Sequence, residues 1–153
     1  MSRLHPGDLA PDFCLLDHDG NEVTARSLRG QRVVLYFYPE DDTPGCTREA
    51  CQFNDERAAL ADLGVAIYGV SPDGAASHQA FRAAYGLTFP LLSDPEKGVM
   101  AAYGAYGEKL NYGKTIMGVI RSTFVISPDG VIEHAWYGIK TEGHAARVRK
   151  ALS

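Results

Sequence analysis

Two segments of the chain, 33–38 and 65–70, are apolar at nearly every position and rich in β-branched and aromatic residues. Apolar runs of this length and composition are typical of strands that are covered on both faces of a sheet. Residues 47–63, between them, are rich in Ala, Glu, Arg and Leu and are followed by Gly64, a pattern that predicts a helix. A strand, a helix and a second strand in this order predict a parallel pair with a crossover helix.

Turn signals elsewhere predict two hairpins. An Asp-Gly turn at 19–20 separates two short extended segments near the N-terminus, and a Pro-Asp-Gly turn at 128–130 separates segments 122–127 and 131–137. Shorter elements are also expected, namely one helical turn at 27–30, helices at 73–85, 96–103 and 141–152, and a strand at 89–92. The stretch 104–118 is rich in glycine and tyrosine and is expected to be an irregular loop.

These elements together predict an α/β fold. Parallel strands joined by helices, then an antiparallel hairpin and a terminal helix, form a mixed central sheet flanked by helices, with a further β-hairpin at the N-terminus. The thioredoxin-like fold has this order of elements. The chain has 153 residues, no internal repeat and no linker-like segment, so we expect a single domain over residues 1–153.

Composition and charge exclude several classes of protein. The chain is 45% apolar and 22% charged, as is usual for globular domains. Its net charge of -4 comes from residues of both signs without long blocks, which disfavours a nucleic-acid or membrane-surface partner. No segment has the length of a membrane span, and the N-terminus lacks the apolar core of a signal peptide. We therefore expect a cytoplasmic protein that binds neither nucleic acid nor membrane.

The chain has three cysteines, Cys14, Cys46 and Cys51. An odd and small number argues against a disulfide framework, so in a reducing compartment they are expected to be thiols or redox-active. Cys14 lies in an apolar segment and is interpreted as a packed structural residue, with a role as a competing thiol left open. The five histidines lack the spacing of metal ligands, and most of them are expected on the surface.

The segment 38–51 follows the first central strand at its carboxyl end, where open α/β sheets place their ligand crevices. Pro44 and Gly45 cannot extend the strand and are expected to form a tight loop that delivers Cys46 to the first turn of the next helix. Free backbone N–H groups and the helix dipole favour a thiolate there. The hydroxyl of Thr43, three residues earlier, could reach the sulfur or an oxygen of a bound substrate.

Arg121 is the candidate cation for this site. It directly precedes the segment 122–127, which is predicted to lie next to the first central strand, and a guanidinium can stabilise a thiolate and bind a substrate oxygen at once. Glu49 lies one helical turn after Cys46 and is expected to hold the guanidinium through a bidentate pair. The acidic residues 40–42 would oppose a thiolate if they pointed towards it.

The spacing of Cys46 and Cys51 has a mechanical consequence. In an unbroken helix, residues five apart have Cα atoms about 8.5 Å apart. Disulfides do not normally form beyond about 7 Å. A bond between these two sulfurs therefore requires the first turns of the helix to unwind, which would expose the disulfide to a reductant.

These motifs resemble the peroxiredoxins, specifically the bacterioferritin-comigratory or Q subgroup. The matching segments are 36–39, 42–47, Glu49, Cys51, 113–114 and 121–124. The resemblance implies a peroxidatic Cys46, a resolving Cys51 and supporting roles for Pro39, Thr43 and Arg121. It also implies hydrogen peroxide and organic hydroperoxides as substrates, thioredoxin or a similar dithiol protein as reductant, no metal or organic cofactor, and a monomer.

Two other functions remain open at this point. A thioredoxin-like disulfide reductase would use the same fold, but that chemistry usually needs Cys-x-x-Cys, a spacing at which the two sulfurs can bond at a helix start. A non-catalytic redox-sensing or metal-binding module could use the three cysteines, although zinc sites usually have four ligands with paired cysteines.

Overall fold

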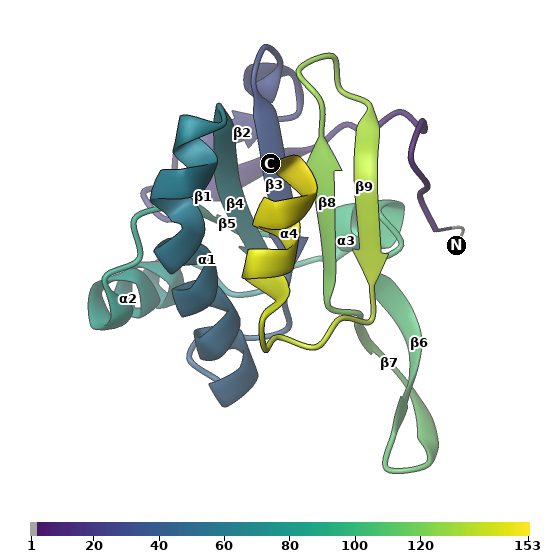
Figure 1. Ribbon diagram of the computed structural model, residues 1–153. Helices are drawn as coiled ribbons and strands as arrows, with labels where there is room; N and C mark the ends of the chain where they lie inside the picture. Colours follow the sequence, from purple (N-terminus) through teal and green to yellow (C-terminus); the bar gives the residue numbers. More distant parts are fainter. Residues whose placement is uncertain (1–2) are drawn as a thin grey trace.

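The computed structural model describes residues 3–153 and has a seven-stranded mixed sheet as its centre (Figure 1). The strand order is β2-β1-β5-β4-β3-β8-β9, in which β3, β4 and β5 are parallel and the other pairs are antiparallel. The strands of this sheet are β1 (Cys14–Asp17), β2 (Glu22–Thr24), β3 (Arg32–Phe37), β4 (Val65–Ser71), β5 (Leu91–Ser93), β8 (Ser122–Ile126) and β9 (Ile132–Tyr137).

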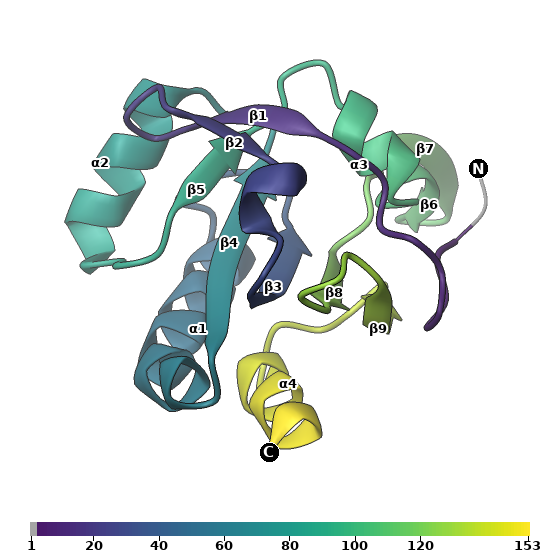
Figure 2. The same cartoon turned by 90° about the horizontal axis from the view of Figure 1, so that it is seen from above.

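Helices cover both faces of the sheet (Figure 2). Helices α1 and α4 lie side by side on one face, α3 lies on the other, and α2 lies beside β5. Their bounds are α1 (Pro44–Asp62), α2 (Ala75–Tyr85), α3 (Gly98–Ala102) and α4 (His144–Leu152), and a single 3-10 turn covers Arg26–Leu28. The predicted α/β, thioredoxin-like architecture with an N-terminal hairpin is confirmed.

The central strand β3 is buried on both sides, as its sequence predicts. Val34 and Tyr36 pack in the core under α1 and α4, whereas Val33, Leu35 and Phe37 pack in the core on the α3 side. This division follows the two-residue period of side chains in a strand. Two separate apolar cores therefore hold β3, and its carboxyl end is a rigid point from which the next loop starts.

Helix α1 begins earlier than predicted. The expected start was residue 47, but the helix begins at Pro44 with Thr43 as its N-cap. Proline is well suited to the first helical position, because its missing N–H has no partner there and its φ is already helical. Cys46 is consequently the third residue of the helix.

The expected loop over 104–118 is wrong. Residues Tyr106–Asn111 (β6) and Lys114–Val119 (β7) form an antiparallel hairpin that projects from the body at the end where α1 begins (Figure 1). Tyr112 and Gly113 both have positive φ, of 52° and 79°, which is the backbone of a tight two-residue hairpin turn. Most β7 side chains are exposed, so the apolar alternation that marks a half-buried strand is weak here.

Within residues 3–153, no helix is long and apolar enough to cross a membrane.

Candidate active site

Cys46 lies in the first turn of α1 with its side chain turned into the protein. Only 1% of the residue is exposed, and it belongs to the core cluster that also contains Tyr36, Ala50 and Phe53. The first helical hydrogen bond runs from the Thr47 N–H to the Thr43 carbonyl at 2.8 Å. The N–H groups before Thr47 have no acceptor within the helix, so this end carries a partial positive charge next to the sulfur.

The guanidinium of Arg121 contacts both the sulfur and a buried carboxylate. Its Nη2 lies 3.4 Å from Cys46 Sγ, and its Nη1 donates to Glu49 Oε1 at 2.7 Å. The sheet register brings it there, because Ser122 at the start of β8 is paired with Phe37 at the end of β3. This is the neighbourhood that the sequence predicted for Arg121.

Gly45 makes this approach possible. A Cβ added at Gly45 would lie 3.3 Å from Arg121 Nη2, closer than most Cβ contacts. A side chain at this position would therefore press on the guanidinium at the point where it meets the sulfur. The sequence interpretation gave Gly45 only a turn-forming role.

The predicted bidentate pair between Arg121 and Glu49 is not what the structure contains. The guanidinium divides its two terminal nitrogens between sulfur and carboxylate, so Glu49 accepts through Oε1 alone and Oε2 has no hydrogen-bond partner among the described residues. Glu49 is 1% exposed, and burial raises its pKa to about 7 despite the opposing effect of Arg121.

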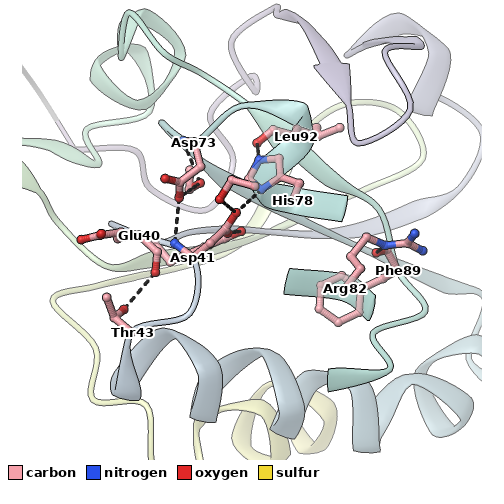
Figure 3. Close-up of polar contacts among 11 residues, drawn as sticks. Glu40, Asp41, Thr43, Asp73, His78, Arg82, Phe89 and Leu92 are labelled. Atoms are coloured by element: carbon pink, nitrogen blue, oxygen red, sulfur yellow. Dashed lines mark hydrogen bonds and ion pairs between the residues drawn. The ribbon is translucent and has the colours of Figure 1, made fainter. Parts of the chain in front are cut away.

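Thr43 and Pro39 border the site. The Thr43 hydroxyl donates to the Glu40 carbonyl at 2.9 Å, so its single proton is not directed at the sulfur (Figure 3). Its oxygen can still accept a hydrogen bond. Pro39 is partly buried and follows the last residues of β3, where its ring fixes the direction of the chain as the loop begins.

The acidic residues before the cysteine have partners of their own. Asp41 accepts from Tyr38 and lies 2.7 Å from His78, whereas Asp42 accepts from the Tyr85 hydroxyl at 2.6 Å. Glu40 is exposed. The carboxylates of Asp41 and Asp42 are therefore directed at these partners. Their repulsion of a Cys46 thiolate, which was considered from the sequence, is weakened.

Cys51 lies on the same unbroken helix as Cys46, and both are free thiols. Cys51 is partly buried, and burial together with the nearby Asp55 raises its pKa. Helix α1 includes every residue between the two cysteines, so a disulfide between them requires this part of the helix to unwind.

Comparison with known proteins identifies the family. The AhpC/TSA family profile matches residues 6–135, most of the chain. The chain belongs to the AhpC/TSA family. Its relatives make it a peroxiredoxin of the bacterioferritin-comigratory or Q subgroup, as the motifs indicated. Peroxiredoxin Bcp of Escherichia coli is 42% identical over 144 residues, which are 94% of this chain and 92% of that protein.

Solved structures of the same subgroup have the same fold as this peroxiredoxin. Peroxiredoxin Q of Xanthomonas campestris matches with a TM-score of 0.87 at 41% identity, covering 92% of this chain and 89% of that one. A mutant of Xylella fastidiosa PrxQ matches with a TM-score of 0.92 at 35% identity, covering 99% and 97%.

Two interpretations of individual residues are wrong. Cys14 is exposed on β1 rather than packed, and its neighbour Leu15 takes the buried position of that strand. Three of the five histidines, His18, His78 and His144, are buried rather than on the surface. For His78 and His144, the sequence signal that could have predicted burial is the apolar spacing of α2 and α4, which places these two residues on the inward faces of the helices. Within residues 3–153, no group of three or more His, Cys, Asp or Glu side chains is arranged to hold a metal ion.

Proposed function

We propose that this peroxiredoxin reduces hydrogen peroxide and organic hydroperoxides with Cys46 as the attacking sulfur. The observation that carries the proposal is the contact of 3.4 Å between Arg121 Nη2 and Cys46 Sγ at the start of α1. A fixed cation and the positive end of a helix both favour the thiolate, which is the nucleophilic form. Structures of the Xanthomonas campestris bacterioferritin comigratory protein address alkyl peroxide reduction by that relative, which supports organic hydroperoxides as substrates here.

In the first step a lone pair of the Cys46 thiolate attacks one peroxide oxygen along the O–O axis. The S–O bond forms as the O–O bond breaks, and the bonding pair leaves with the second oxygen, which takes up a proton as water or an alcohol. Sulfur is thereby oxidised by two electrons to a sulfenic acid. Arg121 and the free amides of the first turn of α1 stabilise the charge that develops on the leaving oxygen. Thr43 accepts the hydrogen of the bound hydroperoxide, and Pro39 shapes the entrance.

Glu49 holds Arg121 in this role. The hydrogen bond of 2.7 Å from Nη1 fixes the plane of the guanidinium, so that Nη2 is directed at the sulfur. A planar group held at two points loses little freedom when it also binds a substrate oxygen. Glu49 is therefore a positioning residue that acts through Arg121.

Cys51 is the resolving thiol in the second step. Its sulfur attacks the sulfenic sulfur of Cys46, a disulfide forms and water leaves. The first turns of α1 unwind for this, because an intact helix keeps the two Cα atoms about 8.5 Å apart. Thioredoxin or a similar dithiol protein then reduces the exposed disulfide. The protein works as a cytoplasmic monomer of a single domain and uses neither nucleic acid nor membrane.

Peroxide titration with thiol counting and intact mass tests these roles. Wild type is expected to lose two of its three thiols for each peroxide consumed. Cys46→Ser should barely react, because the remaining cysteines lack the cation. Cys51→Ser should stop at a sulfenic acid or proceed to a sulfinic acid.

Cys14→Ser is the matched control for the titration. This variant also removes one thiol, but from β1, which is separated from β3 by two strands of the sheet, and it should turn over like wild type. Rapid turnover by Cys46→Ser would refute the assignment of the attacking sulfur.

A further inference from the structure

Asp41 is held by four other residues through its carboxylate and its backbone N–H (Figure 3). Its Oδ1 accepts from the Tyr38 hydroxyl at 2.6 Å. Its Oδ2 accepts from the Ser77 hydroxyl at 2.8 Å and from His78 Nδ1 at 2.7 Å. Its backbone N–H donates to Asp73 Oδ2 at 2.7 Å. The loop between β3 and α1 is thus tied to the beginning of α2 four residues after β3 ends.

His78 is held by its neighbours at both ring nitrogens. The ring is fully buried, and its Nε2 lies 3.0 Å from the Leu92 carbonyl, which can only accept, so Nε2 carries a hydrogen. Nδ1 faces a carboxylate that already accepts from two hydroxyl groups. Although burial alone would raise the pKa of Asp41, the hydrogen bonds from His78 and Tyr38 hold it below its usual value. His78 therefore links Asp41 to the Leu92 carbonyl of β5 through its two ring nitrogens, and Asp73 and Tyr38 are the other titratable groups around this buried pair.

A second fixed point follows the two cysteines. Phe53 is fully buried and stacks on Tyr36 of β3, with ring centroids 4.6 Å apart. Cys46 and Cys51 both lie between Asp41 and Phe53. The segment that must unwind for disulfide formation therefore has one buried anchor on each side.

We propose that the Asp41–His78 pair is the upstream anchor of this segment and positions Cys46 for its reaction with peroxide. This inference rests on the roles proposed above for Cys46 and Cys51. The pair stays closed in the reduced and in the disulfide form and confines unwinding to the residues that follow it. Neither residue contacts the reacting atoms, so both are positioning residues that act through the loop.

The physical reason is a local folding equilibrium. A segment with fixed ends gains less conformational entropy on unwinding than one with a free end, and it refolds to a single geometry. Loss of the anchor favours the unwound form, in which Cys46 is away from Arg121 but can reach Cys51. Oxidation by peroxide is then slowed, while formation of the disulfide is unchanged or faster. A variant that was only less stable overall would not separate the two steps in this way.

Hydrogen exchange on the wild-type protein tests the anchor without any substitution. The reduced and disulfide forms are compared by amide exchange with mass analysis of short peptides. Amides of 47–51 should lose protection on oxidation, whereas the Asp41 amide and the first turns of α2 should keep it. Equal loss of protection at Asp41 and at 47–51 would overturn the proposal.

Rapid-quench kinetics with hydrogen peroxide test it by substitution. In His78→Gln the phase proportional to peroxide should slow by about 10- to 100-fold, because misplacing a reacting group by ~1 Å costs up to about 100-fold. The phase independent of peroxide, which reports disulfide formation, should be as fast as in wild type or faster. Asp41→Asn should largely preserve the loop, because its side-chain amide can donate to His78 Nδ1 while Nε2 still donates to the Leu92 carbonyl.

Gln79→Ala is the matched control for these kinetics. Gln79 neighbours His78 on α2 but donates to the His18 carbonyl, so both phases should match wild type. An unchanged first phase in a folded His78→Gln variant, or both phases slowed by the same factor, would refute the anchor. Absence of two phases in wild type would instead refute the proposed roles of the two cysteines.

Discussion

Replacing Arg121 with lysine removes one specific feature of the site while keeping its charge. The guanidinium reaches Cys46 Sγ and Glu49 Oε1 with two different nitrogens, at 3.4 Å and 2.7 Å. A lysine has a single nitrogen on a flexible stem and cannot be held by the carboxylate in the same plane as it meets the sulfur. We expect the ammonium of Arg121→Lys to pair with Glu49, so that the sulfur and the peroxide lose their donor.

The size of the effect follows from the contact that is lost. A hydrogen bond to a charged group contributes about 1.5–3 kcal/mol. Each 1.36 kcal/mol in an activation free energy changes a rate about tenfold. The second-order rate constant for the reaction of Cys46 with hydrogen peroxide should therefore fall by about 10- to 150-fold. Arg121→Met, which also removes the charge, should be slower still.

The measurement is made in a Cys51→Ser background, so that only the first step is observed. Reduced protein is mixed with excess peroxide, quenched at short times and analysed by intact mass for added oxygen. Arg48→Lys, an exposed arginine on the same helix, is the matched control and should leave the rate unchanged. If Arg121→Lys is folded and reacts as fast as the background protein, the two-partner geometry has no catalytic value and the reasoning fails.

Three further predictions concern stability. His144→Gln removes a buried imidazole whose pKa is lowered by burial from 6.5 to about 4. The wild-type protein therefore loses up to about 3 kcal/mol of unfolding free energy as pH falls from 6.5 to 4. The difference in unfolding free energy between wild type and variant, measured by chemical denaturation, should shrink over that window. In Glu49→Gln the pH dependence has the opposite sign, because the folded state binds the Glu49 proton more tightly than the unfolded state. Wild type should lose stability relative to the variant as pH rises from 4.5 to about 7, and a difference in stability that is constant with pH would contradict this. Gly69→Ala should cost about 1–3 kcal/mol in thermal unfolding, since its Cβ would lie 2.9 Å from the buried Tyr36 ring, and an unchanged melting temperature would show that the core yields there.

The elements that sequence patterns predicted well are those whose burial is uniform. Segment 33–38 is apolar because both faces of β3 are covered, and the prediction for β4 ended one residue before the strand does. Helix α1 is buried on one side only, and it begins three residues before its predicted start. The hairpin over Tyr106–Val119 was missed because little of it is buried, so no alternation of apolar and polar residues records its period. Hydrophobic periodicity in a sequence therefore indicates an element only where that element is buried on at least one side.

The geometry of the candidate site was likewise predictable only in part. The position of Cys46 at a helix start and its proximity to Arg121 were predictable, because local turn residues and the pairing of neighbouring strands determine them. The split contact of Arg121 and the single bond to Glu49 were not, because they depend on ångström distances between side chains from different elements.

By itself, the sequence determined the chemistry of this protein: a cysteine delivered to a helix start, a second thiol five residues later, and an arginine at the head of the adjacent strand. Only the tertiary structure decided which buried groups support them. Asp41 and His78 are 37 residues apart, and neither carries a local sign of its partner. The reason is physical, since hydrophobic period and turn preference are local properties, whereas the partner of a buried charge depends on how whole elements pack.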